Sequence, residues 1–379
     1  MSTINTNVMS INAQRNLSAS TGSLATSMQR LSSGLRVNSA KDDAAGLAIS
    51  ERMNSQVKGL NVAIRNANDG ISLAQTAEGA MAEIGNNLQR IRELAVQSSN
   101  ATNSATDREA LQKEVSQLQA EIQRVATQTE FNGTKLLDGS FTGKAFQVGA
   151  NAGQLITVDA VTNAQTAQLG GSYFAGDEVM TTDNAAAING LTINGVVIDD
   201  VAVAADADAQ AAALAQAINA KSGESGVYAS VSGDDVTLES LIADKDLVVS
   251  AGTVGATTYS DTAAAPTSDA SATTQVYVSD VDIEDFVGAQ RAIGIMEAAL
   301  TTINSARADM GAIQNRFGSV IQNLQTSSEN LSAARGRIVD ADFAKETANL
   351  SRAQILQQAG TAMVAQANQL PQGVLSLLR

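Results

Sequence analysis

Residues 293–338 read IGIMEAALTTINSARADMGAIQNRFGSVIQNLQTSSENLSAARGRI, and one apolar position recurs in them every seven residues. The residues at this position are Met296, Ile303, Met310, Phe317, Leu324, Leu331 and Ile338, and a second heptad position holds Ile293, Leu300 and Ile321. A seven-residue apolar repeat is typical of a long helix that packs lengthwise against another helix. We therefore expect a helical rod, with a core that includes Met296, Ile303, Met310, Phe317, Leu324 and Leu331.

Polar residues interrupt the second heptad position, and two interpretations of them stay open. They are Arg307, Gln314, Ser328 and Arg335. In the first interpretation they select the register or the oligomeric state of the packed helices. In the second they are the solvated edge of a narrow apolar stripe.

A matching helix is predicted in the amino-terminal part of the chain. In residues 60–95, apolar side chains follow one another at steps of three or four, which keeps one face of a helix apolar for about ten turns. The residues of this face that we assign to the rod core are Ile64, Ile71 and Leu88. A second helix repeats the pattern in residues 111–125, and Thr106 with Glu109 predicts a capping box at its start.

Each end of the chain also has the pattern of an amphipathic helix. The apolar residues are Ile4, Ile11, Leu17, Leu24 and Leu31 near the amino end, and Leu356, Met363, Leu370 and Leu377 near the carboxyl end. An amphipathic helix alone in water leaves its apolar stripe exposed, so these helices must pair with each other or with other molecules. If they pair with each other, both termini lie at one end of an antiparallel rod. We interpret the nine residues as an assembly seam.

The composition excludes most catalytic and metal-binding chemistry. The 379 residues include no His, Cys or Trp, so the chain has no imidazole base or ligand, no thiolate nucleophile and no disulfide. We therefore expect no enzyme, no cofactor and no metal site.

Three pairs of adjacent acidic residues are the remaining candidates for chemistry: Asp42-Asp43, Asp199-Asp200 and Asp234-Asp235. The first pair has no base nearby, and we interpret it as part of a connector between helices. The other two pairs could contact a divalent cation, but neither has the spacing of a calcium-binding loop, which favours solvated turns.

The net charge of −15 is concentrated in the middle of the chain. Of the 39 acidic and 24 basic residues, 17 acidic and 3 basic residues lie within 141–280. This balance predicts no binding to nucleic acid or to an anionic membrane surface. No stretch has the roughly 18 apolar residues of a transmembrane helix, and MSTINTNVMS is not typical of a signal peptide. These rules alone predict a cytosolic protein without membrane insertion.

The middle of the chain changes from helical to mixed patterns. GLTINGVVIDD places Asn194-Gly195 between two short apolar runs, which predicts a β-hairpin. A short helix is expected in ADAQAAALAQAINAKSG, ending at Gly223, and two more strands in GVYASVSGDDVTLES. We interpret residues 173–280 as a small separate α+β module.

Several long motifs resemble bacterial flagellin, in the same order and at the expected spacing. They are NTNVMSINAQRNL (5–17), LSSGLRVNSAKDDAAGLAIS (31–50), LQRIRELAVQSSN (88–100), EFNGTKLLDG (130–139), NRFGSVIQNL (315–324) and the whole of 329–378. In the middle, INGLTINGVVID and the residues that follow it are similar to a module found in some flagellins and hook-associated proteins. The resemblance covers roughly the first 140 and the last 100 residues.

The resemblance implies a structural subunit that polymerises into the helical filament of the bacterial flagellum and enables swimming. It implies a mainly α fold, in which long antiparallel terminal helices form a coiled-coil rod, with a small β-rich variable outer domain. The implied domains are inner helices at 1–44 and 336–379, a helical rod domain with a β-hairpin region at 45–172, its carboxyl-terminal rod helix at 281–335, and the acidic outer domain at 173–280.

Partners and location follow from the same resemblance. The implied partners are further copies of the chain, hook-associated junction and cap proteins, a flagellar export chaperone at residues 350–378, and the vertebrate innate-immune receptor for flagellin. The terminal segments of the family are disordered in free monomers and become ordered on assembly, as in coupled folding and binding. The family leaves the cell through the flagellar export apparatus without a cleaved signal, so the resemblance implies an extracellular filament instead of a cytosolic protein.

Four residues match the family positions that the innate-immune receptor binds: Gln89, Arg90, Leu94 and Glu114. The alternative is that Arg90 and Glu114 are ordinary polar residues on the outer face of two packed helices. Two alternatives also remain for the whole chain. One is a hook–filament junction protein that forms a short ring, and the other is an adhesin or host-receptor ligand.

Overall fold

The computed structural model of the protein describes residues 6–159, 161–182, 187–250, 253–254, 257–258, 262–264 and 275–376. The chain divides into two compact units. The first consists of Met1–Ala67, Gln147–Leu155 and Gly318–Arg379, and the second of Asn68–Phe146 and Ile156–Phe317. Long helices dominate, and strands are confined to short hairpins and a small mixed part in the middle of the chain. The predicted fold class, mainly α with a small α+β part, is therefore confirmed.

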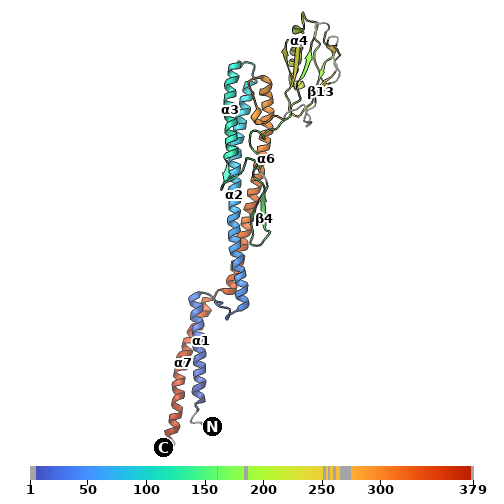
Figure 1. The fold of residues 1–379 in the computed structure, drawn as a ribbon. Helices are drawn as coiled ribbons and strands as arrows, with labels where there is room; N and C mark the ends of the chain where they lie inside the picture. Colours follow the sequence, from blue (N-terminus) through green and yellow to red (C-terminus); the bar gives the residue numbers. More distant parts are fainter. Residues whose placement is uncertain are drawn as a thin grey trace. The chain divides into compact units, whose positions relative to one another are not determined.

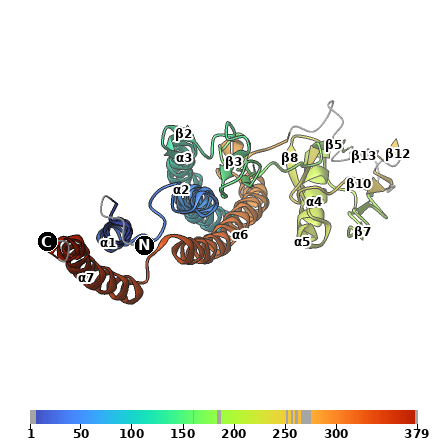
Figure 2. The same cartoon turned by 90° about the horizontal axis from the view of Figure 1, so that it is seen from below.

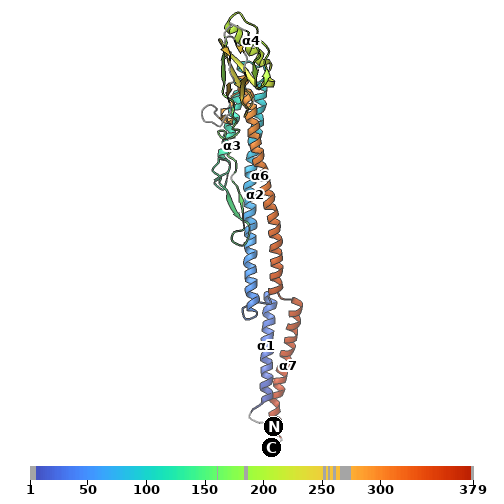
Figure 3. The same ribbon diagram turned by 90° about the vertical axis from the view of Figure 1, so that its right-hand side faces the viewer.

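The terminal helices of the first unit are α1 (Val8–Ser33) and α7 (Phe343–Ser376), which lie side by side in Figures 1 and 3. The side chain of Asn7 begins α1 by accepting the N–H of Ser10 at 3.1 Å. Gly34 ends α1 because its φ of 70° is left-handed, and its N–H donates to a carbonyl of the last helical turn.

Two longer helices, α2 (Ala44–Ser98) and α6 (Phe286–Val339), have residues in both units. The expected boundary between residues 335 and 336 falls inside α6, which continues to Val339. The helix stops there because Asp340 forms a β-bridge with Leu35, and Asp342 accepts the N–H of Ala344 at 3.0 Å at the start of α7. The break between α6 and α7 is therefore set by capping interactions, which the seven-residue apolar spacing does not reveal.

In the first unit, α2 and α6 pack through a small cluster of buried residues, Leu60, Ala63 and Leu324. Two of the predicted core residues, Ile64 and Leu331, pack against this cluster and are only half-buried. They lie at the edge of the core, and the prediction that they lie inside it was wrong. The neighbouring Ala63 occupies the interior because its small side chain lets the two helices approach closely.

In the second unit, α2, α3 (Ala105–Gln128) and α6 form a three-helix bundle, seen along its helices in Figure 2. Its buried residues include the predicted core residues Leu88, Met296, Ile303, Met310 and Phe317, together with Met81, Ile84, Ile91 and Ile122. Ile71 is half-buried, and the adjacent Leu73 and Ala74 are buried in its place. The second bundle helix begins two residues earlier than predicted. Its N-cap is Ser104, which forms the capping box with Asp107, so the assignment to Thr106 and Glu109 was wrong.

Two hairpins follow α3. The first pairs β1 (Glu130–Phe131) with β2 (Thr134–Lys135), and its turn residues Asn132 and Gly133 have φ values of 49° and 76°. The second pairs β3 (Lys144–Gln147) with β4 (Leu155–Val158), which places strands in the region where a hairpin was expected.

The middle of the chain forms an outer module with two main sheets. The three-stranded sheet has the order β5-β9-β8, from β5 (Glu178–Thr181), β9 (Asp235–Ser240) and β8 (Val227–Ser232). The four-stranded sheet has the order β13-β10-β6-β7, from β13 (Thr262–Ala264), β10 (Leu247–Ser250), β6 (Thr192–Ile193) and β7 (Val196–Val197). The remaining elements are β11 (Thr253–Val254), β12 (Thr257–Thr258), α5 (Ser222–Ser225) and the 3₁₀ turn Val278–Asp280.

The core of the outer module lies between the sheets and α4 (Ala207–Ala220). Leu214 and Ile218 of α4 are buried in it with Val236 and Leu238 of the three-stranded sheet. The predicted hairpin at Asn194-Gly195 and the two strands of GVYASVSGDDVTLES are confirmed. The helix ends at Ala220, because the chain turns into α5 before the expected end at Gly223.

Candidate functional site

The contact between α1 and α7 is made by small and polar side chains. Its buried residues include Ser10, Ser27, Ala353 and Ala367. Two hydrogen bonds of 2.7 Å cross the contact, from Asn7 Nδ2 to the carbonyl of Ala367 and from Ser10 Oγ to Asn368 Oδ1. Small residues let two helices approach closely, but they remove little apolar surface from water.

Many large apolar side chains of the same two helices point into solvent. Eight of them are between 51% and 68% exposed, and we call them the terminal apolar surface: Val8, Met9, Ile11, Met28, Phe343, Ile355, Leu356 and Met363. Exposed apolar side chains concentrated on one helix pair are typical of a surface that binds another protein. Within the described residues, this is the clearest candidate for a functional site.

The predicted seam coincides only partly with this surface. Ile11, Leu356 and Met363 belong to it, whereas the half-buried members of the seam are Leu17, Leu24 and Leu31. Ile4 and Leu377 lie outside the described residues, and only the backbone of Leu370 is described. The heptad count missed Met9, Met28, Phe343 and Ile355 because they do not fall on the seven-residue spacings that it followed. No common spacing links these four residues, so the sequence pattern carries no clear signal for them.

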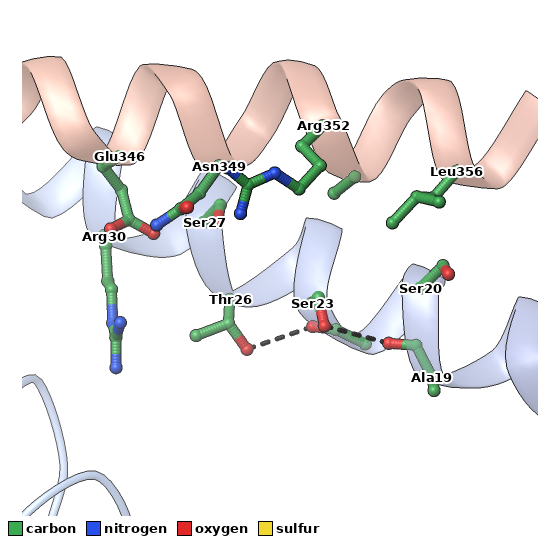
Figure 4. Close-up of a pocket in the computed structure, with 12 residues that line it drawn as sticks. Ala19, Ser20, Ser23, Thr26, Ser27, Arg30, Glu346, Asn349, Arg352 and Leu356 are labelled. Atoms are coloured by element: carbon green, nitrogen blue, oxygen red, sulfur yellow. Dashed lines mark hydrogen bonds between the residues drawn. The ribbon is translucent and has the colours of Figure 1, made fainter.

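A groove of about 650 Å³ lies between α1 and α7 (Figure 4). Ser23 and Thr26 line it from α1, but their hydroxyls donate to carbonyls of their own helix at 3.1 and 3.0 Å. Glu346 and Arg352 line it from α7, and Glu346 is only 7% exposed. These two hydroxyls already donate within α1, so they are not free donors for a small ligand.

The predicted receptor residues divide into an exposed and a buried part. Arg90 is exposed on α2, and its guanidinium donates to Glu114 at 2.8 Å and to Glu93 at 3.0 Å. The hydrogen bond to Glu114, followed by that to Glu93, raises the pKa of Arg90. Gln89 is exposed as well, but Leu94 is 1% exposed in the bundle core. Leu94 is therefore placed to support the helix that presents Arg90, and its assignment to receptor recognition stays a prediction.

The acidic pairs lie in turns and loops and at the starts of α2 and β9. Asp43 accepts the N–H of Gly46 at 2.8 Å at the beginning of α2, and hydrogen bonds from Ser39 lower the pKa of Asp42. Asp200 accepts the N–H of Gly190 at 3.1 Å, and Asp235 accepts the hydroxyl of Thr181 at 2.6 Å. Across the described residues, no group of three or more acidic side chains is arranged to hold a metal ion.

No helix in the described part of the chain combines the length and apolarity needed to span a membrane. The terminal apolar surface is formed by single exposed apolar side chains on helices whose other residues are largely small or polar.

Comparisons with known proteins assign the terminal helices and the outer module to described families. Residues 4–142 match the bacterial flagellin N-terminal helical region, residues 293–378 match the bacterial flagellin C-terminal helical region, and residues 190–253 match the flagellin hook IN motif. The three matches fall on the helices that carry the terminal apolar surface, on the bundle and on the outer module.

Relatives align along the whole chain. The B-type flagellin of Pseudomonas aeruginosa is 41% identical and covers 100% of this chain and 99% of its own length. Flagellin B of Vibrio cholerae is 43% identical and covers 99% of both chains. The solved structure of FliC from Burkholderia pseudomallei is 29% identical, covers 65% of this chain and 99% of its own, and has a TM-score of 0.39. The protein therefore belongs to the bacterial flagellin family, and it is a structural subunit of the flagellar filament and not an enzyme.

Proposed function

We propose that the terminal apolar surface binds neighbouring copies of the chain in a helical filament that drives swimming motility. The observation that carries this proposal is the exposure of Ile355, Leu356 and Met363 beside a helix contact built from Ser and Ala. Fully burying one such side chain contributes about 1.5–3 kcal/mol, so several of them at each contact favour a stable polymer. A contact that repeats with a rotation that does not close produces a helical fibre.

The same packing supports ordering of the terminal helices during assembly. The contact between α1 and α7 buries small residues such as Ala353 and Ala367, so the isolated pair gains little from burial. A neighbouring subunit adds the missing apolar contacts. Their favourable free energy then offsets the conformational entropy that the terminal helices lose when they become ordered. Circular dichroism should show a gain of helix on polymerisation, and an unchanged helical signal would contradict this ordering step.

Seeded elongation tests the assembly proposal. Monomer with Ile355→Asp is added to short filament seeds, and growth is followed by electron microscopy. A carboxylate on the assembly contact must be buried without a partner, so we expect elongation to fall about a hundredfold or more. Val203→Asp is the matched control, because Val203 is a similarly exposed apolar residue in the outer module. Normal elongation by the Ile355→Asp variant would contradict the proposal.

Motility and the alternative of a junction ring have separate readouts. Cells that make only the Ile355→Asp variant should lose swimming in soft agar, whereas cells that make the Val203→Asp variant should swim. Swimming by the Ile355→Asp cells would contradict the role in motility. Wild-type monomer that forms only short rings on the seeds would favour the hook–filament junction protein.

A second function is supported by the exposed pair of Arg90 and Glu114. We propose that the vertebrate innate-immune receptor binds this pair with Gln89, on a surface held rigid by the buried Leu94. Arg90→Ala should weaken receptor binding by about tenfold or more without changing the melting temperature. Arg92→Ala is the control, because Arg92 pairs with Glu297 of α6 at 2.7 Å and not with Glu114. Equal effects of both substitutions would contradict this assignment.

The remaining partners are proposed from the family and from the terminal apolar surface. An export chaperone would cover residues 350–378 before export through the flagellar apparatus, and hook-associated junction and cap proteins would contact the filament ends. The exposure of Ile355 and Met363 supports a chaperone contact, since an apolar face in a monomer needs cover. The chaperone of the same flagellar system should then slow seeded elongation in proportion to its concentration. Elongation at full rate in excess chaperone would contradict this partner.

A further inference from the structure

The methionines of the described chain divide sharply by exposure. Met9 is 64%, Met28 57% and Met363 61% exposed, and all three belong to the terminal apolar surface. The buried methionines are Met81, Met180, Met296 and Met310, none more than 4% exposed. Met53 on α2 is intermediate. Solvent exposure controls how fast a thioether meets an oxidant in solution, so this division predicts two classes of reactivity.

The amino-acid composition leaves few other side chains that compete with these three residues for an oxidant. Cys, His and Trp are absent from the sequence, so no thiol, imidazole or indole competes for the oxidant. Buried methionines are shielded by the helices that pack over them. Among the described methionines, the first that a peroxide meets are therefore the exposed thioethers of α1 and α7.

We infer that Met9, Met28 and Met363 are oxidation sites at which a peroxide turns off assembly of the monomer. The inference rests on the proposed role of the terminal apolar surface. The Met sulfur attacks one oxygen of hydrogen peroxide, an S–O bond forms and the O–O bond breaks. The second oxygen leaves as hydroxide and takes the proton of the hydroxyl group transferred to sulfur, which gives water and the neutral sulfoxide. The thioether loses two electrons and becomes a sulfoxide, and the peroxide is reduced.

The sulfoxide changes what a neighbouring subunit meets. Its oxygen is a hydrogen-bond acceptor, and the terminal apolar surface supplies the partner subunit mainly with aliphatic and aromatic groups. A buried acceptor without a donor weakens the contact, so we expect oxidised monomer to elongate seeds about tenfold or more slowly. Oxidation adds no charge and breaks no contact of the bundle core. The oxidised monomer therefore keeps its fold.

The experiment treats monomer with hydrogen peroxide, maps oxidation by peptide mass spectrometry, and measures seeded elongation. We expect oxygen at Met9, Met28 and Met363 before Met81 and Met296, an unchanged circular dichroism spectrum, and recovery of elongation after treatment with methionine sulfoxide reductases. Preassembled filaments should be protected at the same three positions. Full elongation with all three residues oxidised would overturn the inference, as would equal oxidation of exposed and buried methionines.

A variant separates this inference from the assembly proposal. Met9→Leu, Met28→Leu and Met363→Leu combined keep the apolar volume but remove the sulfur. This variant should elongate seeds in peroxide as well as without it. Failure of untreated wild-type monomer to elongate would contradict the assembly proposal itself, whereas peroxide sensitivity of the variant would overturn only the oxidation sites. If the variant folds poorly, reductase treatment of the oxidised wild type still tests the inference, because elongation that stays lost after the sulfoxides are reduced would overturn it.

Discussion

The three-helix bundle and the terminal helix pair have the same apolar spacing and use it in opposite ways. In the bundle, Met296, Ile303 and Phe317 are spaced by multiples of seven residues and fully buried. In the terminal pair, Leu356 and Met363 are also seven residues apart, and both are more than half exposed. The seven-residue repeat therefore identifies an apolar stripe without identifying what covers it.

Small residues decide which face of each helix is covered within the chain. Gly70 in the bundle lies against the ring of Phe317, so a large side chain from α6 fills the space that a small residue leaves. In the terminal pair Gly360 lies against Leu17, but most of the contact is between small residues on both helices. The bundle is thus packed as a complete core, and the terminal pair keeps its large side chains for another molecule.

The largest difference between the two regions is expected for removal of a large apolar side chain. Phe317→Ala should lower the free energy of unfolding by about 3–5 kcal/mol, because it leaves a cavity beside Gly70 and Phe146. Ile355→Ala should change it by less than about 0.5 kcal/mol, because the side chain is exposed. Chemical denaturation of the monomer measures both. Similar losses would show that the two helix pairs are packed alike.

Glycine substitutions, which add a methyl group instead of removing a side chain, also distinguish the two regions. A Cβ at Gly70 would lie 2.7 Å from the Phe317 ring, so Gly70→Ala should cost about 1–3 kcal/mol. A Cβ at Gly22 of α1 meets nothing within 4 Å, and Gly22→Ala should stabilise the helix by about 0.5–1 kcal/mol. The melting temperature of the monomer should fall for Gly70→Ala, and that of the assembled filament, in which α1 is ordered, should rise for Gly22→Ala. A lower melting temperature for Gly22→Ala would contradict the open packing of α1.

Buried hydroxyls give the smallest of these contrasts. Ser98 of the bundle donates to the carbonyl of Ile283 at 2.5 Å, and Ser98→Ala should cost about 1–2 kcal/mol because that carbonyl loses its partner. Ser27 of the terminal pair is also buried, but no hydrogen bond of its hydroxyl is found within the described residues. Ser27→Ala should therefore be neutral within about 0.5 kcal/mol. Equal losses in the free energy of unfolding for Ser98→Ala and Ser27→Ala would contradict this distinction.

Much of the fold could be predicted because it depends on local pattern. The heptad from Met296 to Leu324 and the Asn194-Gly195 hairpin were both predicted, since periodicity and turn chemistry are properties of neighbouring residues. The start of α3 was misplaced by two residues because Ser104 and Thr106 are both acceptable caps in sequence. The hydrogen bonds that Ser104 exchanges with Asp107 distinguish the two, and these bonds depend on the path of the preceding loop.

The candidate site was harder to predict for a physical reason. Whether an apolar residue is buried within the chain depends on how closely two helices approach, and that depends on residues such as Ala353 and Ala367 on the opposite face. Leu94 shows the same limit, because its neighbours Gln89 and Arg90 are exposed while it lies in the bundle core. A linear motif includes residues from both faces of a helix, and only packing separates them.

Thiol labelling tests the central claim most directly, since the chain has no Cys of its own. Monomers with Met363→Cys or Val203→Cys are each co-assembled with excess wild-type subunit, and the rate of thiol labelling is compared between monomer and filament. Both positions are more than half exposed in the monomer. The terminal apolar surface predicts that labelling at position 363 slows by roughly tenfold or more in the filament, while position 203 keeps its rate. Equal rates at position 363 in monomer and filament would contradict the claim that this surface assembles the polymer.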